Sequence, residues 1–173
     1  MVRAALGRNS QINRGPKRLA RFIPALSVVA ASSFALLPIV TTIGWIPDFG
    51  FLLLIAWRLL RADAIPGWWA AMLGLVNDLL TGSPIGLSVA IWTAAVLALD
   101  LLDRRTMWRD YWIEWGLAAL LIFGNDVARW RIDAAMGAPY EFRVILPPFI
   151  IGVLVFPIAA WCASALDRWR LGR

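Results

Sequence analysis

Two long stretches without a charged residue constrain this chain more than any other feature. Residues 22–46 and 144–166 contain no Asp, Glu, Lys or Arg, and they are 25 and 23 residues long. A helix needs about 20 apolar residues to cross the hydrocarbon core of a bilayer, whereas a signal peptide has an apolar run of only roughly 7–15. The first stretch is therefore predicted to be a retained membrane anchor. The apolar content of 61% is also well above the roughly 45–50% of soluble domains.

Shorter apolar segments bring the predicted number of crossings to six, which makes the chain an all-α membrane protein with one domain over residues 22–166. The second segment is only 12 residues long, too short for a simple crossing. Either Arg58 extends it by reaching the interface, or it forms a re-entrant or short tilted helix. Pro38 is expected to kink the first crossing. The six predicted crossings are 22–46, 49–60, 65–80, 84–99, 111–127 and 144–166, with a short segment at 129–143.

The basic residues predict the orientation of these crossings. With a cytoplasmic N-terminus and six crossings, 14 of the 17 Lys and Arg residues fall inside, and only Arg129, Arg131 and Arg143 fall outside. Cytoplasmic segments of membrane proteins carry this excess of positive charge. Residues 1–21 and 167–173 are thus predicted to be basic cytoplasmic tails. The net charge of +6 indicates contact with anionic lipids rather than with nucleic acid.

The sequence offers no catalytic set. It has no histidine, which removes the commonest general base and metal ligand, and its single cysteine, Cys162, has no disulfide partner. A Gly-rich phosphate loop and a serine with a suitable base are also missing. We therefore assign no catalytic, cofactor-binding or metal-binding residue and expect the protein not to be an enzyme.

The most informative polar residue is Asp78, which precedes a predicted helix end at Gly82. A carboxylate is unfavourable near a helix C-terminus, and at membrane depth it costs about 2.5–3.5 kcal/mol. A hydrogen-bond partner is therefore expected, with Asn77, Thr81 and the amides of the Gly82-Ser83 turn as candidates. Two interpretations stay open: Asp78 braces the turn, or it contacts a partner protein or ligand.

Several other residues have simpler interpretations. Asp48 is predicted to cap the helix that follows it. The spacing of Asp126 and Arg129 allows a local ion pair. Gly82 is expected to take a left-handed conformation, and Ser83-Pro84 to begin the next helix. Small and polar side chains also recur at helical spacing, which lets helices approach closely; this stripe is predicted to serve internal packing and consists of Ala70, Ala71, Gly74, Asn77 and Asp78.

These residues resemble a known family, the rod shape-determining protein MreD. The resemblance rests on Pro47-Asp48 before a leucine run, on Arg58 after that run, and on the pattern Gly-Leu-x-x-Asp-Leu-Leu-Thr-Gly-Ser-Pro-x-Gly from Gly74 to Gly86. The family pattern carries over to Pro47, Asp48, Gly74, Asp78, Leu79, Thr81, Gly82, Ser83, Pro84 and Gly86.

The resemblance implies a non-catalytic scaffold of the cell-elongation complex in the bacterial inner membrane, which regulates cell shape and peptidoglycan synthesis. It implies MreC as the main partner, and the actin-like MreB, the glycosyltransferase RodA and a class B penicillin-binding transpeptidase as direct or indirect partners. It also implies a fold similar to the six-helix substrate-binding subunits of energy-coupling-factor vitamin transporters. Because the two share that expected fold, a small-molecule-binding membrane subunit remains the alternative.

Overall fold

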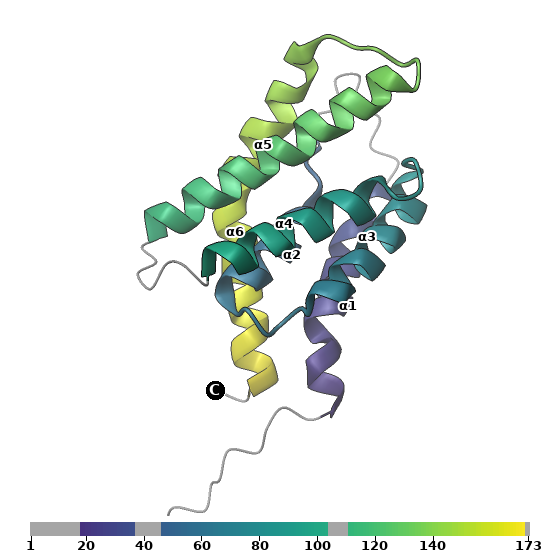
Figure 1. Cartoon of the computed structure of the whole chain (residues 1–173). Helices are drawn as coiled ribbons and strands as arrows, with labels where there is room; N and C mark the ends of the chain where they lie inside the picture. The colour runs from purple at the N-terminus through teal and green to yellow at the C-terminus, as the bar shows by residue number, and fades with distance from the viewer. Residues whose placement is uncertain (1–17, 37–45, 104–110, 172–173) are drawn as a thin grey trace, which may run out of the picture.

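The computed structural model describes residues 18–36, 46–103 and 111–171. This part of the chain is all-helical, as predicted, with six α-helices and no strand (Figure 1). The predicted kink at Pro38, the N-terminal tail up to residue 17 and the basic loop at 104–110 lie outside the described residues. The elements are η1 (Arg18–Phe22), α1 (Ile23–Ser32), η2 (Ser33–Leu36), α2 (Phe49–Leu60), α3 (Gly67–Thr81), α4 (Leu87–Asp103), α5 (Tyr111–Ala135), η3 (Phe142–Ile145) and α6 (Leu146–Leu171).

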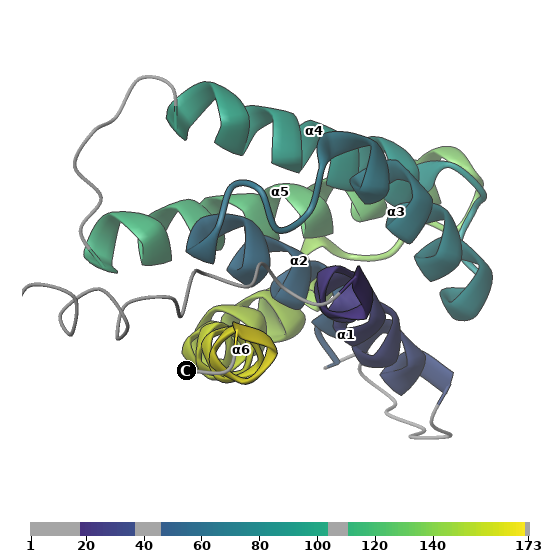
Figure 2. The same ribbon diagram turned by 90° about the horizontal axis from the view of Figure 1, so that it is seen from below.

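The short helix α2 forms the centre of the bundle. Every residue from Gly50 to Leu59 is buried, which is typical of a helix that is apolar on all sides. Helices α1, α4, α5 and α6 all contact it, and Figure 2 shows it between α4 and α5 on one side and α1 and α6 on the other. A helix of this length, enclosed in this way, serves mainly as the core around which the longer helices pack.

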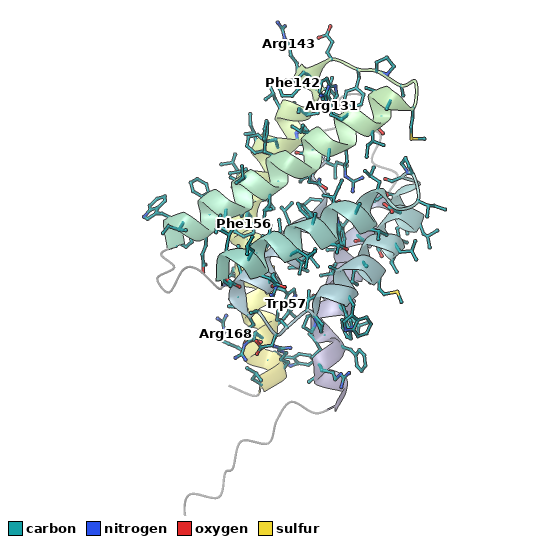
Figure 3. All side chains as sticks on the ribbon, viewed as in Figure 1. Trp57, Arg131, Phe142, Arg143, Phe156 and Arg168 are labelled. Carbon is teal, nitrogen blue, oxygen red and sulfur yellow. The ribbon has the colours of Figure 1, made fainter. Side chains whose placement is uncertain are left out.

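Ion pairs connect neighbouring helices at both ends of α2. The start of α2 lies beside the end of α5, where Arg129 forms an ion pair with Asp48. The end of α2 lies beside α6, where Arg61 forms an ion pair with Asp167. Figure 3 shows Arg131 and Arg143 at one end of the molecule and Arg168 at the other, so the predicted division of the basic residues has a spatial counterpart.

The structure tests the predicted membrane crossings only in part. Within the described residues, one helical segment, Phe142–Leu171, is long and apolar enough to cross a membrane by its length and composition. The apolar helices Ala20–Leu36 and Phe49–Leu60 are shorter. Six separate crossings therefore remain a prediction, as does the similarity to transporter subunits.

Two predicted helix boundaries are wrong near the cluster described below. Helix α5 continues to Ala135 instead of ending at residue 127, because no glycine or proline follows until Gly137, which takes a φ of +88°. Arg129 and Arg131 thus lie on the last turns of a helix and not in a loop. Helix α4 begins at Leu87 rather than at residue 84, because Gly86 takes a φ of +100°.

The predicted C-terminal tail is also mostly helical. Helix α6 continues through Asp167 to Leu171, and the Asp167 carboxylate is only 8% exposed. It accepts hydrogen bonds from Arg61 Nε at 3.0 Å and from Arg170 Nε at 2.7 Å. The pair with Arg61 holds the last turns of α6 against the end of α2, and the pair with Arg170 lies within α6; sequence composition alone indicated neither.

Candidate functional site

Polar side chains from four helices gather at the end of the bundle where α2 begins. We call them the Asp48 cluster: Asp48, Asn77, Asp78, Ser83, Ser88 and Arg129. Arg129 connects the most elements, since its Nη2 donates to Asp48 Oδ2 and to Ser88 Oγ, both at 2.8 Å. Its Nη1 donates to Ser83 Oγ at 3.2 Å. One guanidinium from α5 thereby joins the start of α2, the start of α4 and the turn between α3 and α4.

Asp48 has two roles in this cluster. Its Oδ1 accepts a hydrogen bond from the Phe51 amide at 3.0 Å, so the predicted N-cap of α2 is confirmed. Its Oδ2 accepts from Arg129 and, at 3.4 Å, from Asn77 Nδ2. Arg129 therefore forms its ion pair with Asp48, which is 81 residues away in sequence. Asp126, the local partner that the three-residue spacing allows, is not the residue it pairs with.

Asp78 caps the helix that follows it, although it belongs to α3. The side chain is almost fully buried, and its two oxygens accept hydrogen bonds from the Gly86 amide at 2.8 Å and the Ser88 amide at 2.9 Å. These amides open α4, where backbone N–H groups lack partners and the helix dipole favours negative charge. The donors are not the Gly82-Ser83 amides expected from sequence. The interpretation that Asp78 braces the turn is the one that this geometry supports.

The turn itself uses the predicted residues. Gly82 takes a φ of +68° at the C-cap of α3, and the Ser83 amide donates to the Asp78 carbonyl oxygen at 3.2 Å, as in helix ends closed by a left-handed glycine. The Thr81 and Ser83 hydroxyls lie 2.8 Å apart. The Pro84 carbonyl oxygen accepts from the Leu87 amide at 3.1 Å.

Gly74 explains why α3 and α4 pack so closely. A Cβ atom at Gly74 would lie 2.7 Å from backbone atoms of Ser88, so no larger residue fits without moving a helix. Ala70, Asn77 and Asp78 on the same face are also buried. The stripe of small and polar residues on α3 therefore packs inside the molecule, as predicted.

A cavity of about 490 Å³ lies beside the Asp48 cluster. Of the motif residues singled out from sequence, Pro47, Asp48, Asn77 and Thr81 line it, and so do Asp126 and Arg129. Polar groups from α5 complete one wall, and apolar side chains from α1, η2 and α6 form much of the rest. The cavity is lined by Ala31, Ser32, Ala35, Ile46, Pro47, Asp48, Phe49, Asn77, Thr81, Asn125, Asp126, Arg129, Tyr140, Val144, Ile145 and Pro148.

Tyr140 closes part of the cavity wall from the loop after α5. Its hydroxyl donates to Asp133 Oδ2 at 3.2 Å, and its carbonyl oxygen accepts from Trp130 Nε1 at 2.9 Å. Burial raises the pKa of the Tyr140 phenol above its usual value, and the charge of Asp133 adds to this effect. Tyr140 therefore stays neutral at physiological pH.

Sequence reasoning missed Ser88, which is fully buried and accepts from both Asn77 Nδ2 and Arg129 Nη2. A serine inside an apolar segment gives no local signal, and only its place two residues after Gly86 could have drawn attention to it. Comparison with family models, with curated proteins and with solved structures finds no match to this chain.

Proposed function

We propose that the chain is a multi-pass inner-membrane scaffold of the MreD type. In this role it binds MreC and, directly or through MreC, works with MreB, RodA and a class B penicillin-binding transpeptidase. It regulates cell shape and peptidoglycan synthesis by holding these partners and not by catalysis. Both termini are cytoplasmic in this proposal, and the Asp48 cluster lies toward the outer face.

The observation that carries the proposal is the meeting of two separate parts of the sequence resemblance. Pro47-Asp48 and the pattern from Gly74 to Gly86 are distant in sequence, yet Arg129 donates hydrogen bonds both to Asp48 Oδ2 and to Ser83 Oγ. Asn77, at a variable position of the pattern, also lies within 3.4 Å of Asp48 Oδ2 through its Nδ2. Two parts of the sequence that carry the resemblance are thus held at one place in the molecule, which supports treating them as one site.

Exposed apolar side chains support the membrane location. Many large apolar side chains are exposed in the described part of the chain, as is typical of protein that contacts lipid or other protein. These side chains lie on most of the helices and include Leu26, Met72, Leu97, Leu120, Leu154, Ile158 and Trp161. The segment Phe142–Leu171 is also long enough for one crossing.

Co-purification tests the scaffold role. The tagged full chain, expressed with MreC of the same organism, is solubilised from membranes in mild detergent. We expect MreC to co-purify, and an unrelated single-span protein at the same level to stay behind. A folded chain that retains neither MreC nor any of the other three partners would argue against the scaffold.

Cysteine labelling tests the orientation. In a Cys162→Ser background, Ala138→Cys lies in the exposed loop after α5, and Asp63→Cys lies in the exposed loop between α2 and α3. A membrane-impermeant maleimide added to intact spheroplasts is expected to label position 138 and to reach position 63 only after permeabilisation. The opposite pattern would invert the proposed topology.

A second function is favoured by the cavity. A volume of about 490 Å³ is in the range of small-molecule sites, which are mostly apolar with a few placed polar groups. A small-molecule-binding subunit would retain its ligand through purification, which mass spectrometry of the denatured protein would reveal.

A further inference from the structure

The cavity wall contains buried oxygen atoms that have no hydrogen-bond partner. They are Asn77 Oδ1, Asn125 Oδ1 and Asp126 Oδ2, and the only unpaired donor among the described residues that line the cavity is Arg129 Nε. The two asparagines are at most 1% exposed. A buried polar group without a partner destabilises a protein by about 1–3 kcal/mol, so a ligand that donates hydrogen bonds to these oxygens would be favoured.

The neighbouring hydrogen bonds fix these oxygens as acceptors. Asn77 donates through Nδ2 to Ser88 Oγ at 3.1 Å, and Asn125 donates through Nδ2 to Asp126 Oδ1 at 3.1 Å. Turning the Asn125 amide over would place its oxygen against a carboxylate oxygen, which cannot donate when ionised. The described residues that line the cavity therefore have three unpaired acceptor atoms and one unpaired donor atom.

The charged residues that line the cavity favour a cationic ligand. The charged residues that line the cavity are Asp48, Asp126 and Arg129. Arg129 is already paired with Asp48 at 2.8 Å, so the carboxylate of Asp126 leaves a net charge of minus one. A cation is the ligand that balances this charge.

The rest of the wall suits an ammonium group attached to an apolar body. Two aromatic rings, those of Phe49 and Tyr140, line the cavity, and aromatic faces attract ammonium ions. Apolar side chains such as Ile46 and Val144 also line it. We propose that this cavity binds a ligand through a primary ammonium group, which donates to the oxygens of Asn77, Asn125 and Asp126.

A primary ammonium has three N–H donors, which matches the three unpaired oxygens, whereas a trimethylammonium has the same charge and no N–H donor. The oxygens are covered in the structure, so the ligand engages them as the wall side chains rotate toward it. The ammonium belongs either to the headgroup of an ethanolamine phospholipid or to a soluble amine. The lipid source rests on the proposed membrane location, and the soluble source does not.

Two matched pairs of probes test the proposal with the full chain. Nanodiscs contain phosphatidylglycerol mixed equally with phosphatidylethanolamine or with phosphatidylcholine, and native mass spectrometry counts the lipid that stays bound after detergent extraction. In detergent, ethanolamine or choline is titrated and thermal unfolding is followed. We expect retention of phosphatidylethanolamine over phosphatidylcholine, and stabilisation by ethanolamine but not by choline.

Asp126→Asn removes the unbalanced charge while keeping the side-chain shape, and we expect it to weaken binding of either ammonium probe by about tenfold or more. Asp63→Asn removes a carboxylate from an exposed loop and serves as the matched control, with unchanged binding. If Asp126→Asn unfolds early without any probe, Asn125→Leu replaces it, because it removes one acceptor and no charge.

Each outcome decides the proposal. Stabilisation by ethanolamine together with equal retention of the two lipids supports a soluble amine, and selective retention of phosphatidylethanolamine supports a lipid headgroup. No response to either ammonium probe, equal responses to ethanolamine and choline without lipid selectivity, or unchanged binding in Asp126→Asn would overturn it. Co-purification of MreC is measured separately, so failure of the scaffold role is distinguishable from failure of this site.

Discussion

The two ends of α2 hold their charges in different ways. At the far end from the Asp48 cluster lies the Arg58 cluster, which consists of Trp57, Arg58, Arg61, Asp100, Asp167 and Arg170. There Arg58 pairs with Asp100 of α4, and both Arg61 and Arg170 pair with Asp167 of α6. The Arg170 guanidinium also lies 5.1 Å from the centre of the Trp57 ring. Each charged group in these pairs meets an opposite charge directly, between helices for Arg58 and Arg61 and within α6 for Arg170.

The Asp48 cluster works mostly through backbone amides, hydroxyls and side-chain amides. Asp78 is held by two amides and no cation, and Ser88 accepts from two side chains at once. This network needs buried asparagines whose remaining oxygens have no partner, and a cavity lies beside it. The Arg58 cluster is therefore suited to connecting helices, whereas the Asp48 cluster connects helices and also leaves polar groups available for a ligand.

The largest effect is expected from Asp78→Ala at the Asp48 end. The substitution removes the acceptor for two buried amides at the start of α4, and we expect the free energy of unfolding to fall by about 3 kcal/mol. Chemical unfolding in detergent micelles would measure this. Because both donors lie within the chain, MreC capture by the protein that remains folded is expected to be unchanged.

Asp63→Ala is the control for that experiment, since Asp63 lies in an exposed loop and its removal should alter stability little. A folded Asp78→Ala protein of parental stability that loses MreC would show that Asp78 serves a partner and not the turn. That result would also remove the basis for the contrast between the two clusters.

Much of the Asp48 end follows from local sequence. The N-cap by Asp48, the left-handed Gly82 and the close approach at Gly74 each depend on a residue type whose short-range chemistry limits its conformation, and the structure has all three. The donors to Asp78 lie in the next helix, because a turn of this length brings the start of α4 back over the end of α3. Local spacing therefore identified the residue correctly and its donors wrongly.

The long-range contacts could not be read from the sequence. Arg129 reaches Asp48 and Arg61 reaches Asp167, and neither pair has a spacing that marks it. Trp57 lies near the end of an apolar segment, where tryptophan is typical of a membrane interface, yet it is fully buried and donates to Ser27 Oγ at 2.9 Å. Periodicity identifies which segments are helical, whereas the packing around α2 decides which charged residues meet.

A smaller effect is expected from Gly82→Val, which tests the backbone of the Asp48 end apart from its side chains. A Cβ atom at Gly82 would meet nothing within 4 Å, but the φ of +68° is strained for a β-branched residue. We expect a loss of about 2 kcal/mol in stability. Gly82→Asn, which tolerates this conformation, should lose clearly less in the same unfolding assay. Equal losses in the two variants would mean that space and not φ limits this position.

The smallest effects, and the sharpest comparison, are expected from neutralising one arginine at each end. Arg129→Gln leaves Asp48, only 14% exposed in its side chain, without its cation, and we expect a loss of about 1–2 kcal/mol. Arg61→Gln removes a side chain that is 41% exposed, and Arg170 still holds Asp167 at 2.7 Å.

For Arg61→Gln we therefore expect a loss of no more than about 0.5 kcal/mol, as for an exposed ion pair. The effect of added salt on the unfolding temperature should follow the same order. Arg61→Gln should remove a salt-sensitive contribution, because its pair is open to water, whereas the contribution of Arg129 is shielded and should respond less.

The double variant Arg61→Gln/Arg170→Gln provides the decisive comparison. It leaves Asp167 unpaired, so its loss should exceed the sum of the two single losses if the cluster protects its carboxylate by using two cations. If the losses simply add, the two arginines act independently, and redundancy is not what distinguishes the Arg58 end from the Asp48 end.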